Sequence, residues 1–492
     1  MRLRDLASRL GDATLHGGPE VEVASVTYDS RKVQPDSLFV AIRGHATDGN
    51  RFIEAAQRKG ACAVASELEP PAGSTVPWIQ VRNARQALAQ LAAALHGDPA
   101  RSLDLVGITG TNGKTTTAFL SDAALRAGGH TTGLLGTVRY RVGDTVLDAV
   151  RTTPESSDIQ AMFRDMVTAG CDAAVLEVSS HSLMLERVAG CVFRVAVFTN
   201  LTRDHLDFHG DMESYFAAKR ILFERHLNRE GVAVINADDD RAEALRAVCP
   251  GRVLTFGLSA PADFMAEEIR LDLAGTRFRA TTPVGAIEIT TPLLGRFNVE
   301  NVLAALATAV VFEVPLESAV VGLRATTVPG RLERIDVGQP FTVLVDYAHT
   351  DDALRKLLET VRQLGPKKVI TVFGCGGDRD HTKRPLMGAV AARLSERVVV
   401  TSDNPRSEPP EAIIEAILRG MNGNRGAEHL AIPDRREAIQ TALAMAAPGD
   451  VVVVAGKGHE TTQTLRDRTI PFDDREVVKE LLLGGHKQEG DP

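Results

Sequence analysis

The chain of 492 residues is longer than one ordinary domain, so its length predicts two to four domains. Hydrophobic residues make up 44% and charged residues 24% of the sequence, which is typical of a globular protein with buried cores. The formal net charge of -8 argues against nucleic acid or an anionic membrane surface as the main partner, but it leaves room for a local basic pocket that binds an anionic substrate.

The cysteines and the first residues indicate where the protein resides. The 5 cysteines are scattered and form no CxxC pair, so neither a disulfide framework nor a zinc site is expected. The opening MRLRDLASRL has leucines at helical spacing (Leu3, Leu6 and Leu10), which predicts a short amphipathic helix and not a signal peptide. No stretch approaches the roughly 20 apolar residues that span a bilayer. We therefore expect a cytoplasmic protein.

Two polar segments have the composition of linkers between domains. HGDPARS (96–102) precedes an expected apolar strand at 103–109, and TTVPGRLER (326–334) follows a helix-like segment at 298–323. Linkers of this composition commonly separate domains. The linkers predict three domains, namely 1–100, 101–330 and 331–492.

Short runs of valine and isoleucine alternate with amphipathic helical segments through the middle and the end of the chain. Near-continuous apolar strands separated by helices are typical of parallel sheets that are covered on both faces, so we expect an α/β fold. Ligands of such open sheets gather at the carboxyl ends of the strands. The expected strands lie in VAVFTN (195–200), GVAVINA (231–237), KKVITVFG (367–374), ERVVVTSD (396–403) and DVVVVAGKG (450–458), and expected helices in RPLMGAVAARL (384–394) and PEAIIEAILRGM (410–421).

The stretch LVGITGTNGKTTTAFLSDAAL (105–125) carries an apolar strand, a glycine-rich turn and a helix in that order. Gly110 and Gly113 allow backbone amides to approach phosphate oxygens, and the helix N-terminus adds partial positive charge. Lys114 can reach the β- and γ-phosphates of ATP, and the hydroxyl of Thr115 can hold Mg²⁺. The strict GxxxxGK[ST] pattern is not met, and the other interpretation is a glycine-rich turn with an ordinary surface lysine.

Motifs along nearly the whole chain resemble those of the Mur ligases and of their folate-polyglutamate relatives. The loop GTNGKTT is shared by both groups, and DNPR resembles the version of the family that uses meso-diaminopimelate. Besides the loop, the motifs are TYDSR (27–31), LEVSSHSL (176–183), TNLTRDHLDFHG (199–210), YFAAKR (215–220), GRFNVENVLAA (295–305), VPGRLE (328–333), DYAHTDDAL (346–354), GCGGDRD (374–380), DNPR (403–406) and GKGHE (456–460).

The resemblance implies a UDP-binding first domain, a central ATPase domain with a P-loop-type parallel sheet, and a Rossmann-like last domain that binds an amino acid. It implies an ATP-dependent ligase of peptidoglycan synthesis, acting as a monomer with ATP and Mg²⁺. The D-glutamate γ-carboxylate of UDP-N-acetylmuramoyl-L-alanyl-D-glutamate would become an acyl phosphate and then be joined to meso-2,6-diaminopimelate. Two alternatives stay open. The chain could be another ligase of the family, such as a lysine-adding or folate-polyglutamate enzyme. It could also be a non-catalytic module that uses ATP as a switch.

The resemblance also implies the groups that carry the chemistry. Lys114, Glu177, His205 and a CO₂-carbamylated Lys219 correspond to the catalytic set, and the last three with Thr115 correspond to the metal ligands. From the residues alone, Glu177 could instead be a strand-end acid in water, His205 could be structural, and Lys219 could lie on a helix surface. The implied ATP contacts are Gly110, Thr111, Asn112, Gly113, Lys114, Thr115, Thr116, Asn301, Arg331 and Asp346.

Two of these ATP contacts come from the expected last domain. If Arg331 and Asp346 bind ATP, that domain must close over the central one, so the linker at 326–334 is expected to act as a hinge. Asp346 ends the apolar segment FTVLVD, where a ribose-binding acid is plausible, but a helix-capping acid is equally compatible with the sequence.

Two further sets of residues are implied to bind the substrates. Hydroxyls and backbone amides suit a uridine diphosphate, although serine and threonine in turns are often only turn residues. The UDP-precursor contacts implied are Tyr28, Ser30, His45, Ala46, Thr47, Thr152, Thr153, Ser179 and Arg187. One departure is Leu185, where many family members have glutamine.

The loop around DNPR is implied to bind the amine substrate. A guanidinium can bind the second carboxylate that distinguishes diaminopimelate from lysine, whereas the ordinary interpretation of a loop arginine is a solvated surface charge. Glu460 is suited to an ammonium group. The diaminopimelate contacts implied are Arg379, Asp403, Asn404, Pro405, Arg406, Gly456 and Glu460.

Overall fold

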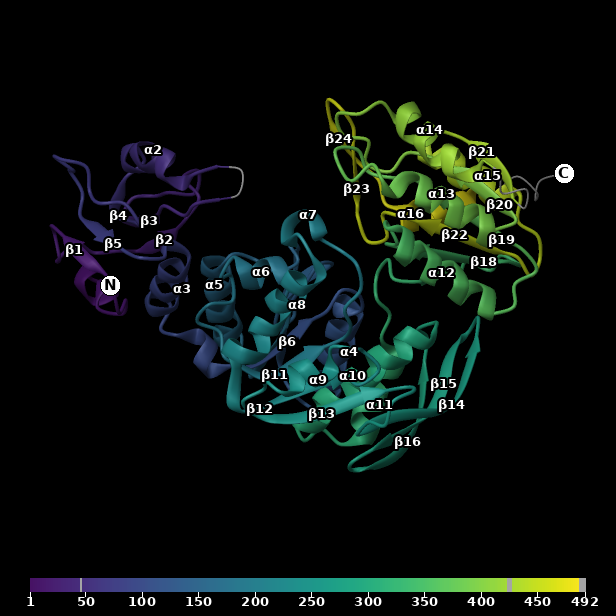
Figure 1. The fold of residues 1–492 in the computed structure, drawn as a ribbon, viewed down its shortest axis with the longest axis horizontal. Helices are drawn as coiled ribbons and strands as arrows, with labels where there is room; N and C mark the ends of the chain where they lie inside the picture. Colours follow the sequence, from purple (N-terminus) through teal and green to yellow (C-terminus); the bar gives the residue numbers. More distant parts are fainter. Residues whose placement is uncertain (45–46, 423–426, 486–492) are drawn as a thin grey trace. The chain divides into compact units, whose positions relative to one another are not determined.

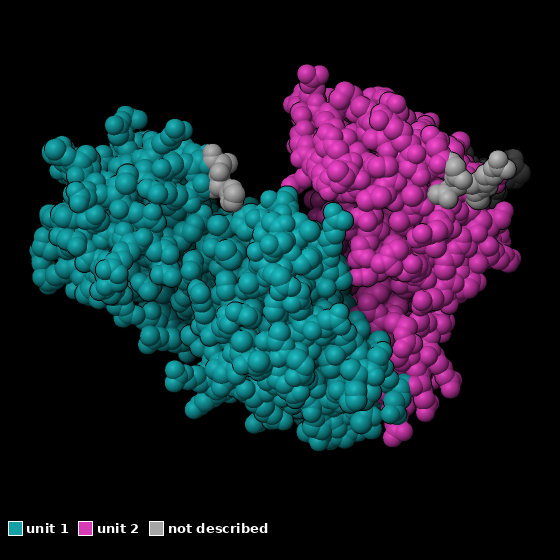
Figure 2. Space-filling model, viewed as in Figure 1, with its two compact units in different colours: residues 1–267, 280–287, 300–323 teal, residues 268–279, 288–299, 324–492 magenta. Residues whose placement is uncertain are grey.

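The computed structural model describes residues 1–44, 47–422 and 427–485 (Figure 1). The chain divides into two compact units (Figure 2). The boundary expected near residue 100 lies inside the first unit, and the second unit takes in short segments that precede residue 330. The first unit comprises 1–267, 280–287 and 300–323, and the second comprises 268–279, 288–299 and 324–492.

The first part of unit 1 is a small sheet in the order β1-β5-β4-β3-β2. Only the β1–β5 pair is antiparallel among the pairings of this sheet in the described residues. Leu3 and Leu6 of α1 are buried in the same core as the alanine-rich face of α3, which confirms the amphipathic helix expected at the start. The elements are α1 (Leu3–Ala7), β1 (Thr14–His16), β2 (Ser25–Thr27), β3 (Ser37–Val40), η1 (Gly49–Phe52), α2 (Ile53–Arg58), β4 (Ala61–Ser66), β5 (Trp78–Gln80), α3 (Ala84–Leu95) and η2 (Pro99–Ser102).

A larger sheet follows, in the order β16-β15-β14-β13-β12-β11-β6-β10-β7-β8-β9. The interior strand β6 runs parallel to both neighbours, β10 and β11, so the carboxyl ends of these strands lie next to one another. The apolar runs expected to be strands are confirmed here as β6, β11 and β12. The strands are β6 (Asp104–Thr109), β7 (Thr132–Leu135), β8 (Arg139–Val142), β9 (Thr145–Asp148), β10 (Ala173–Glu177), β11 (Phe193–Phe198), β12 (Leu227–Asn236), β13 (Arg252–Gly257), β14 (Phe264–Asp272), β15 (Gly275–Thr282) and β16 (Gly285–Thr291).

Helices cover this sheet and carry several of the predicted motifs. Ile159, Phe163 and Met166 of α5 are buried against apolar side chains of the parallel strands. The segment expected as one helix at 298–323 is two helices. The first ends at Val311, Glu313 then takes a positive φ of 59°, and Pro315 directly precedes the second helix. The helices are α4 (Lys114–Ala127), α5 (Ser156–Thr168), α6 (Ser180–Met184), α7 (Leu206–His209), α8 (Met212–Ile221), the π-helical turn η3 (Leu222–His226), α9 (Ala242–Arg246), α10 (Arg296–Val311) and α11 (Leu316–Ala325).

Unit 2 contains a sheet in the order β17-β18-β22-β19-β20-β21, parallel except at the β17 edge. Alternate residues of its strands enter two cores, one with α12, α13 and α14 and the other with α15 and α16. Burial on both faces explains the continuous apolar runs, and the expected parallel sheet is confirmed. The elements are β17 (Glu333–Ile335), β18 (Thr342–Asp346), α12 (Asp351–Gln363), β19 (Val369–Phe373), α13 (Lys383–Leu394), β20 (Arg397–Val400), α14 (Pro410–Met421), β21 (Glu428–Ala431), α15 (Arg435–Ala444), β22 (Val451–Ala455), β23 (Thr462–Thr464), β24 (Thr469–Pro471) and α16 (Asp474–Gly485).

Two expectations about composition can be compared directly with the structure. All the cysteines lie in the described residues and are free thiols, as their scatter predicted. In the part of the chain that the structure describes, none of the helices has the length and apolar character needed to cross a membrane.

Candidate active site

The predicted nucleotide loop follows the carboxyl end of β6 and leads into α4. Gly110 has φ 149° and Gly113 has φ 88°, a region of backbone conformation that favours glycine. A side chain at Gly110 would collide with the Thr199 hydroxyl, and one at Gly113 would collide with the amide oxygen of Asn301. The fold therefore requires glycine at both positions.

Lys114 and Asn301 lie against this loop. The Lys114 Nζ atom donates to the carbonyl oxygens of Gly110 and Thr111, each at 2.9 Å, so the ammonium is held at the turn. The Asn301 Oδ1 atom accepts a 3.1 Å hydrogen bond from the Thr117 hydroxyl on α4. The residues expected to bind phosphate and adenine are thus brought to the same end of α4.

Glu177 ends β10 beside the loop and is 1% exposed, so the alternative of a strand-end acid in water is wrong. Its Oε2 atom accepts from the hydroxyls of Thr115 and Thr137, both at 2.9 Å, and its Oε1 atom accepts from the Thr137 amide at 2.8 Å. A buried carboxylate beside a threonine hydroxyl provides hard oxygen ligands of the kind that Mg²⁺ prefers. Sequence reasoning missed Thr137, whose contact with Glu177 spans 40 residues.

Lys219 lies on α8, as predicted, but it is not on the helix surface. It is 1% exposed, its Nζ atom donates 2.8 Å to the Gly110 carbonyl, and it lies 4.3 Å from the centre of the Tyr215 ring. Burial, together with the Lys114 ammonium, holds the pKa of Lys219 well below its usual range. A lowered pKa increases the fraction of the amine that is neutral and nucleophilic.

His205 lies near two histidines that the sequence reasoning did not select. The ring centre of His181 is 4.8 Å from that of His205 and 5.4 Å from that of His209. Burial and the two neighbouring rings lower the pKa of His181 to about 4, so this ring is neutral at neutral pH. In the described residues, no group of three or more His, Cys, Asp or Glu side chains is arranged to hold a metal. Mg²⁺ usually takes one or two carboxylates and completes its shell with phosphate and water, so the donors present suit that ion.

The irregular segment that directly follows β11 is hydrogen-bonded to the nucleotide loop. The Thr199 hydroxyl donates 2.6 Å to the Asn112 carbonyl, and the Asn112 amide donates 3.0 Å to Asn200 Oδ1. The Thr111 hydroxyl donates 3.1 Å to the carbonyl of Thr202. These supporting residues stand within the TNLTRDHLDFHG motif, which was the only signal in the sequence that pointed to them.

The residues expected for the UDP end of the precursor lie on the small sheet. Tyr28 donates a 3.3 Å hydrogen bond to Asp158 at the start of α5, and burial followed by the Asp158 charge raises the pKa of Tyr28 to about 12. The carbonyl of Ser30 accepts 3.1 Å from Lys59, and the Thr47 carbonyl accepts 2.9 Å from the Gly44 amide. His45 and Ala46 lie outside the described residues.

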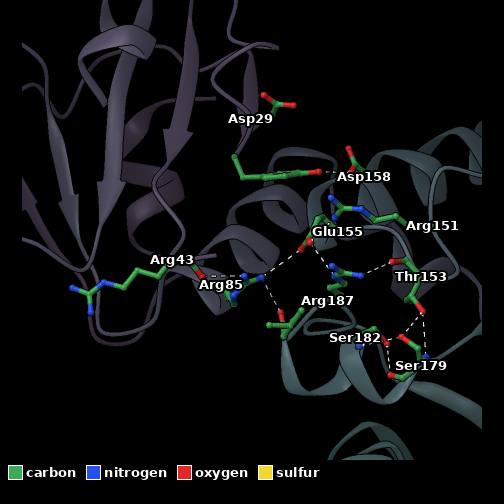
Figure 3. Close-up of polar contacts among 12 residues, drawn as sticks. Asp29, Arg43, Arg85, Arg151, Thr153, Glu155, Asp158, Ser179, Ser182 and Arg187 are labelled. Atoms are coloured by element: carbon green, nitrogen blue, oxygen red, sulfur yellow. Dashed lines mark hydrogen bonds and ion pairs between the residues drawn. The ribbon is translucent and has the colours of Figure 1, made fainter. Parts of the chain in front are cut away.

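The residues expected for the sugar-peptide arm include Thr153, Ser179 and Arg187, which lie close together (Figure 3). The Thr153 hydroxyl donates 2.8 Å to the Glu177 carbonyl and accepts 3.2 Å from the amide of Ser179. The hydroxyl oxygens of Thr137 and Thr152 lie within hydrogen-bond distance, 3.1 Å apart. Arg187 donates 3.2 Å to the Thr153 carbonyl. The predicted phosphate-binding and peptide-binding residues therefore form one continuous hydrogen-bonded set.

Unit 2 carries Arg331 and Asp346 close together. Asp346 accepts from the Leu332 amide at 2.7 Å and from the Ala348 amide at 2.8 Å. The helix that follows is capped by Thr350, so the alternative of Asp346 as a helix cap is wrong. The guanidinium of Arg331 lies 4.4 Å from the centre of the Tyr347 ring. Burial raises the pKa of Asp346, an effect that Arg331 opposes.

The DNPR loop and the GKGHE motif meet after the ends of β20 and β22. Asn404 donates 2.8 Å to Glu460, and the fully buried Lys457 donates to Asn404 Oδ1 at 3.3 Å and to Glu460 at 3.1 Å. A side chain at Gly456, which has φ 116°, would press against Asp403. Lys457 was missed by the sequence reasoning although it stands inside GKGHE.

Arg379 and Arg406, the two arginines expected to bind the second carboxylate of diaminopimelate, differ in their surroundings. Arg406 is partly buried and donates 2.6 Å to the Gly377 carbonyl, whereas Arg379 is exposed. The loop that carries Arg406 also contains Glu408, which pairs with Arg384 at 2.8 Å. Pro405 follows Asn404 in this loop, and its carbonyl accepts 3.1 Å from the Glu408 amide.

A second buried ion pair holds the strand ends of this site. Arg435 is 1% exposed and binds the carboxylate of Asp474 with two hydrogen bonds of 2.8 and 2.7 Å. The same guanidinium donates to the carbonyls of Ser402 and Ala455, which immediately precede the DNPR and GKGHE motifs. Neither residue stood in a motif, so no feature of the sequence pointed to this pair.

Sequence families match most of the chain. The Mur ligase family catalytic domain matches residues 22–96, the Mur ligase middle domain 108–309, and the Mur ligase glutamate ligase domain 330–458. A protein of Solibacter usitatus named UDP-N-acetylmuramoyl-L-alanyl-D-glutamate–2,6-diaminopimelate ligase is 50% identical over 467 residues, which cover 94% of each chain.

The chain belongs to the Mur ligase family.

Other Mur ligases support this assignment at both the sequence and the structure level. A relative of the same name from Bacillus cereus is 44% identical over 98% of this chain and 99% of its own. A solved structure of a UDP-N-acetylmuramoyl-L-alanyl-D-glutamate–2,6-diaminopimelate ligase aligns with a TM-score of 0.72 at 34% identity, over 99% of both chains. A folylpolyglutamate synthase structure from Mycobacterium tuberculosis, at 22% identity and a TM-score of 0.63, shares the fold. The α/β Mur ligase fold predicted from the sequence is confirmed.

Proposed function

We propose that this Mur ligase adds meso-2,6-diaminopimelate to the D-glutamate γ-carboxylate of UDP-N-acetylmuramoyl-L-alanyl-D-glutamate in the cytoplasm, as a monomer that uses ATP and Mg²⁺. The observation that carries the proposal is the hydrogen-bonded set around Glu177. This set joins Thr115 of the nucleotide loop to Thr153, one of the residues expected to bind the sugar-peptide arm and called the peptide set below. A phosphate donor and a carboxylate acceptor held by these residues would lie side by side.

The proposed chemistry follows from the poor reactivity of a carboxylate. A γ-carboxylate oxygen of the precursor attacks the γ-phosphorus of ATP, ADP leaves, and the acyl phosphate forms. The amine nitrogen then attacks the acyl carbon, loses a proton, and expels phosphate with the original carboxylate oxygen. Lys114 is proposed to neutralise charge on the transferred phosphoryl group, because preorganised positive groups act most strongly where charge develops.

The metal would be held by Thr115, Glu177, His205 and carbamylated Lys219. When bound, Mg²⁺ supplies positive charge that offsets the phosphate oxygens. Glu177 and Thr115 already share a hydrogen bond and so can turn their oxygens toward one ion. We propose Gly110, Thr111, Asn112, Gly113, Thr116, Asn301, Arg331 and Asp346 as the remaining ATP contacts.

The substrate sets are proposed as the sequence predicts them. Hydroxyls of Tyr28, Ser30, Thr47, Thr152, Thr153 and Ser179, with Arg187, would bind the UDP-precursor, and the set around Asn404, Arg406 and Glu460 would bind diaminopimelate. We also propose the division into domains at 1–100, 101–330 and 331–492, supported by the three matched segments at 22–96, 108–309 and 330–458.

The test is to incubate the protein with ATP, Mg²⁺, the UDP-dipeptide precursor and one candidate amine at a time, and to determine the mass of the product by mass spectrometry. The proposal expects an amide product with meso-diaminopimelate and phosphate release that requires both substrates. Product with lysine instead would favour the lysine-adding alternative, and ATP hydrolysis that ignores both substrates would favour a switch module. Lys114→Ala serves as the catalytic control and should lose product formation.

A further inference from the structure

Glu155 stands at the centre of an arginine cluster in unit 1 (Figure 3). This carboxylate is 5% exposed, at the start of α5. Its Oε1 atom lies 2.8 Å from Arg151 Nη1 and 2.9 Å from Arg187 Nε, and its Oε2 atom lies 3.6 Å from Arg85 Nη1. Isolated buried carboxylates are costly, so three guanidiniums around one buried carboxylate indicate a built arrangement.

The three arginines come from different parts of the chain. Arg85 lies on α3, Arg151 precedes α5, and Arg187 follows α6. Arg85 also donates 3.4 Å to the Leu185 carbonyl and 3.1 Å to the Arg43 carbonyl. Glu155 therefore ties α3 to the segment that carries Arg187.

The cluster is directly continuous with the peptide set. Arg187 Nε forms an ion pair with Glu155 at 2.9 Å without hydrogen-bond geometry, and Nη1 donates 3.2 Å to the Thr153 carbonyl. The Thr153 hydroxyl in turn donates to the Glu177 carbonyl. The Arg187 side chain is 16% exposed, so the guanidinium still reaches the surface where an anionic group could meet it. Arg151, by contrast, is 44% exposed and contacts the cluster from its rim.

We propose that Glu155 is a positioning residue, which holds the Arg187 guanidinium in the orientation that receives the acidic dipeptide end of the UDP-precursor and couples that orientation to α3 through Arg85. This inference rests on the proposed function. A planar guanidinium recognises a carboxylate only in a restricted set of orientations, so fixing two of its nitrogens selects which edge faces the substrate. Glu155 itself touches no substrate in this arrangement.

The test compares Glu155→Gln, which removes the charge at nearly constant size, with the unaltered enzyme. The KM for the UDP-precursor should rise about tenfold or more, while the KM for ATP stays within about twofold. Glu186→Gln is the matched control, because Glu186 also bonds a residue of α3, Gln86, at 3.4 Å. This control should leave all KM values unchanged.

A double-variant cycle separates positioning from a general structural role. If Glu155 acts through Arg187, then adding Glu155→Gln to Arg187→Met should raise the precursor KM no further than Arg187→Met alone. Additive effects, or an unchanged precursor KM in Glu155→Gln, would overturn the inference. If Glu155→Gln does not fold, Arg85→Met must raise the same KM, and an unchanged value would overturn it as well. An unaltered enzyme that makes no product would instead contradict the proposed function.

Discussion

The hydroxyl of Thr115, at the start of α4, donates a 2.9 Å hydrogen bond to the carboxylate of Glu177, at the end of β10. The two residues are 62 positions apart, and they meet because β6 and β10 are parallel neighbours that end at the same edge of the sheet. One contact thereby connects the nucleotide loop to the strand that leads into the peptide set.

Glu177→Gln should weaken Mg²⁺ use because it removes the negative charge that we assign to the ion. We expect the Mg²⁺ concentration for half-maximal activity to rise by about tenfold or more. The measurement is a Mg²⁺ titration of diaminopimelate-dependent phosphate release. The exposed acid Glu243 gives the control Glu243→Gln, and an identical titration curve for Glu177→Gln would remove Glu177 from metal binding.

Lys219 should be carbamylated when CO₂ is supplied. Since its pKa is lowered by burial, its neutral amine can attack the carbon of CO₂ and lose a proton to form the carbamate. Activity should fall in CO₂-depleted buffer and return with bicarbonate, and labelled CO₂ should give a carbamate signal by carbon-13 NMR. Lys219→Met should lack the signal and the activity, whereas the control Lys356→Met on α12 should keep both. Equal activity of the unaltered enzyme in both buffers, with no carbamate signal, would refute the modification.

Arg406→Ala should lose affinity for diaminopimelate and keep affinity for ATP. Hydrogen bonds to a charged group contribute about 1.5–3 kcal/mol, so the KM for diaminopimelate should rise about 10- to 100-fold. Steady-state kinetics with each substrate varied in turn measures this. The exposed Arg393 on α13 supplies the control Arg393→Ala, and unchanged diaminopimelate kinetics in Arg406→Ala would exclude Arg406 from the role.

Glu408 should stabilise unit 2 at neutral pH and stop doing so in acid. Its hydrogen bonds with Arg384 lower the pKa of Glu408 from 4.5 to about 2, so the folded state favours the charged carboxylate. This contribution is complete above the unfolded pKa and is lost as the pH falls through the folded pKa. The thermal midpoint of Glu408→Gln should therefore lie below that of the unaltered protein near pH 7, and the gap should narrow from about pH 4.5 downward. The control Glu411→Gln, at an exposed acid, should show no such gap, and a gap that is constant with pH would contradict the assignment.

Part of the fold could be predicted because the central parallel strands, such as β6, β10, β19 and β22, are buried on both faces. Continuous runs such as Val451–Ala455 have no amphipathic alternative, and the glycine-rich turn before Lys114 identifies both a loop and the helix that follows. The sequence did not indicate the order of strands in the sheets, because strand pairing depends on contacts far apart along the chain. It also did not indicate the break at Pro315, where helical periodicity continues on both sides of the proline.

The site was predictable where a motif carried it and unpredictable where only tertiary contacts do. Glu177 and Lys219 stood in motifs, but the burial that decides their chemistry comes from packing against the loop. Glu155 and Arg435 stood in none, and most of their partners lie tens of residues away, as in the Arg435–Asp474 pair at a separation of 39. Side chains that support a site through such long-range pairs leave no local signal in a single sequence.

The most direct test of the account is to follow oxygen from the precursor into phosphate. The D-glutamate γ-carboxylate would be labelled with oxygen-18 and the precursor incubated with meso-diaminopimelate and ATP. The mass of the released phosphate would then be measured by mass spectrometry. An acyl phosphate that is opened by the amine must transfer one labelled oxygen to phosphate in each turnover. Unlabelled phosphate, released at the same rate as the amide product, would contradict the mechanism.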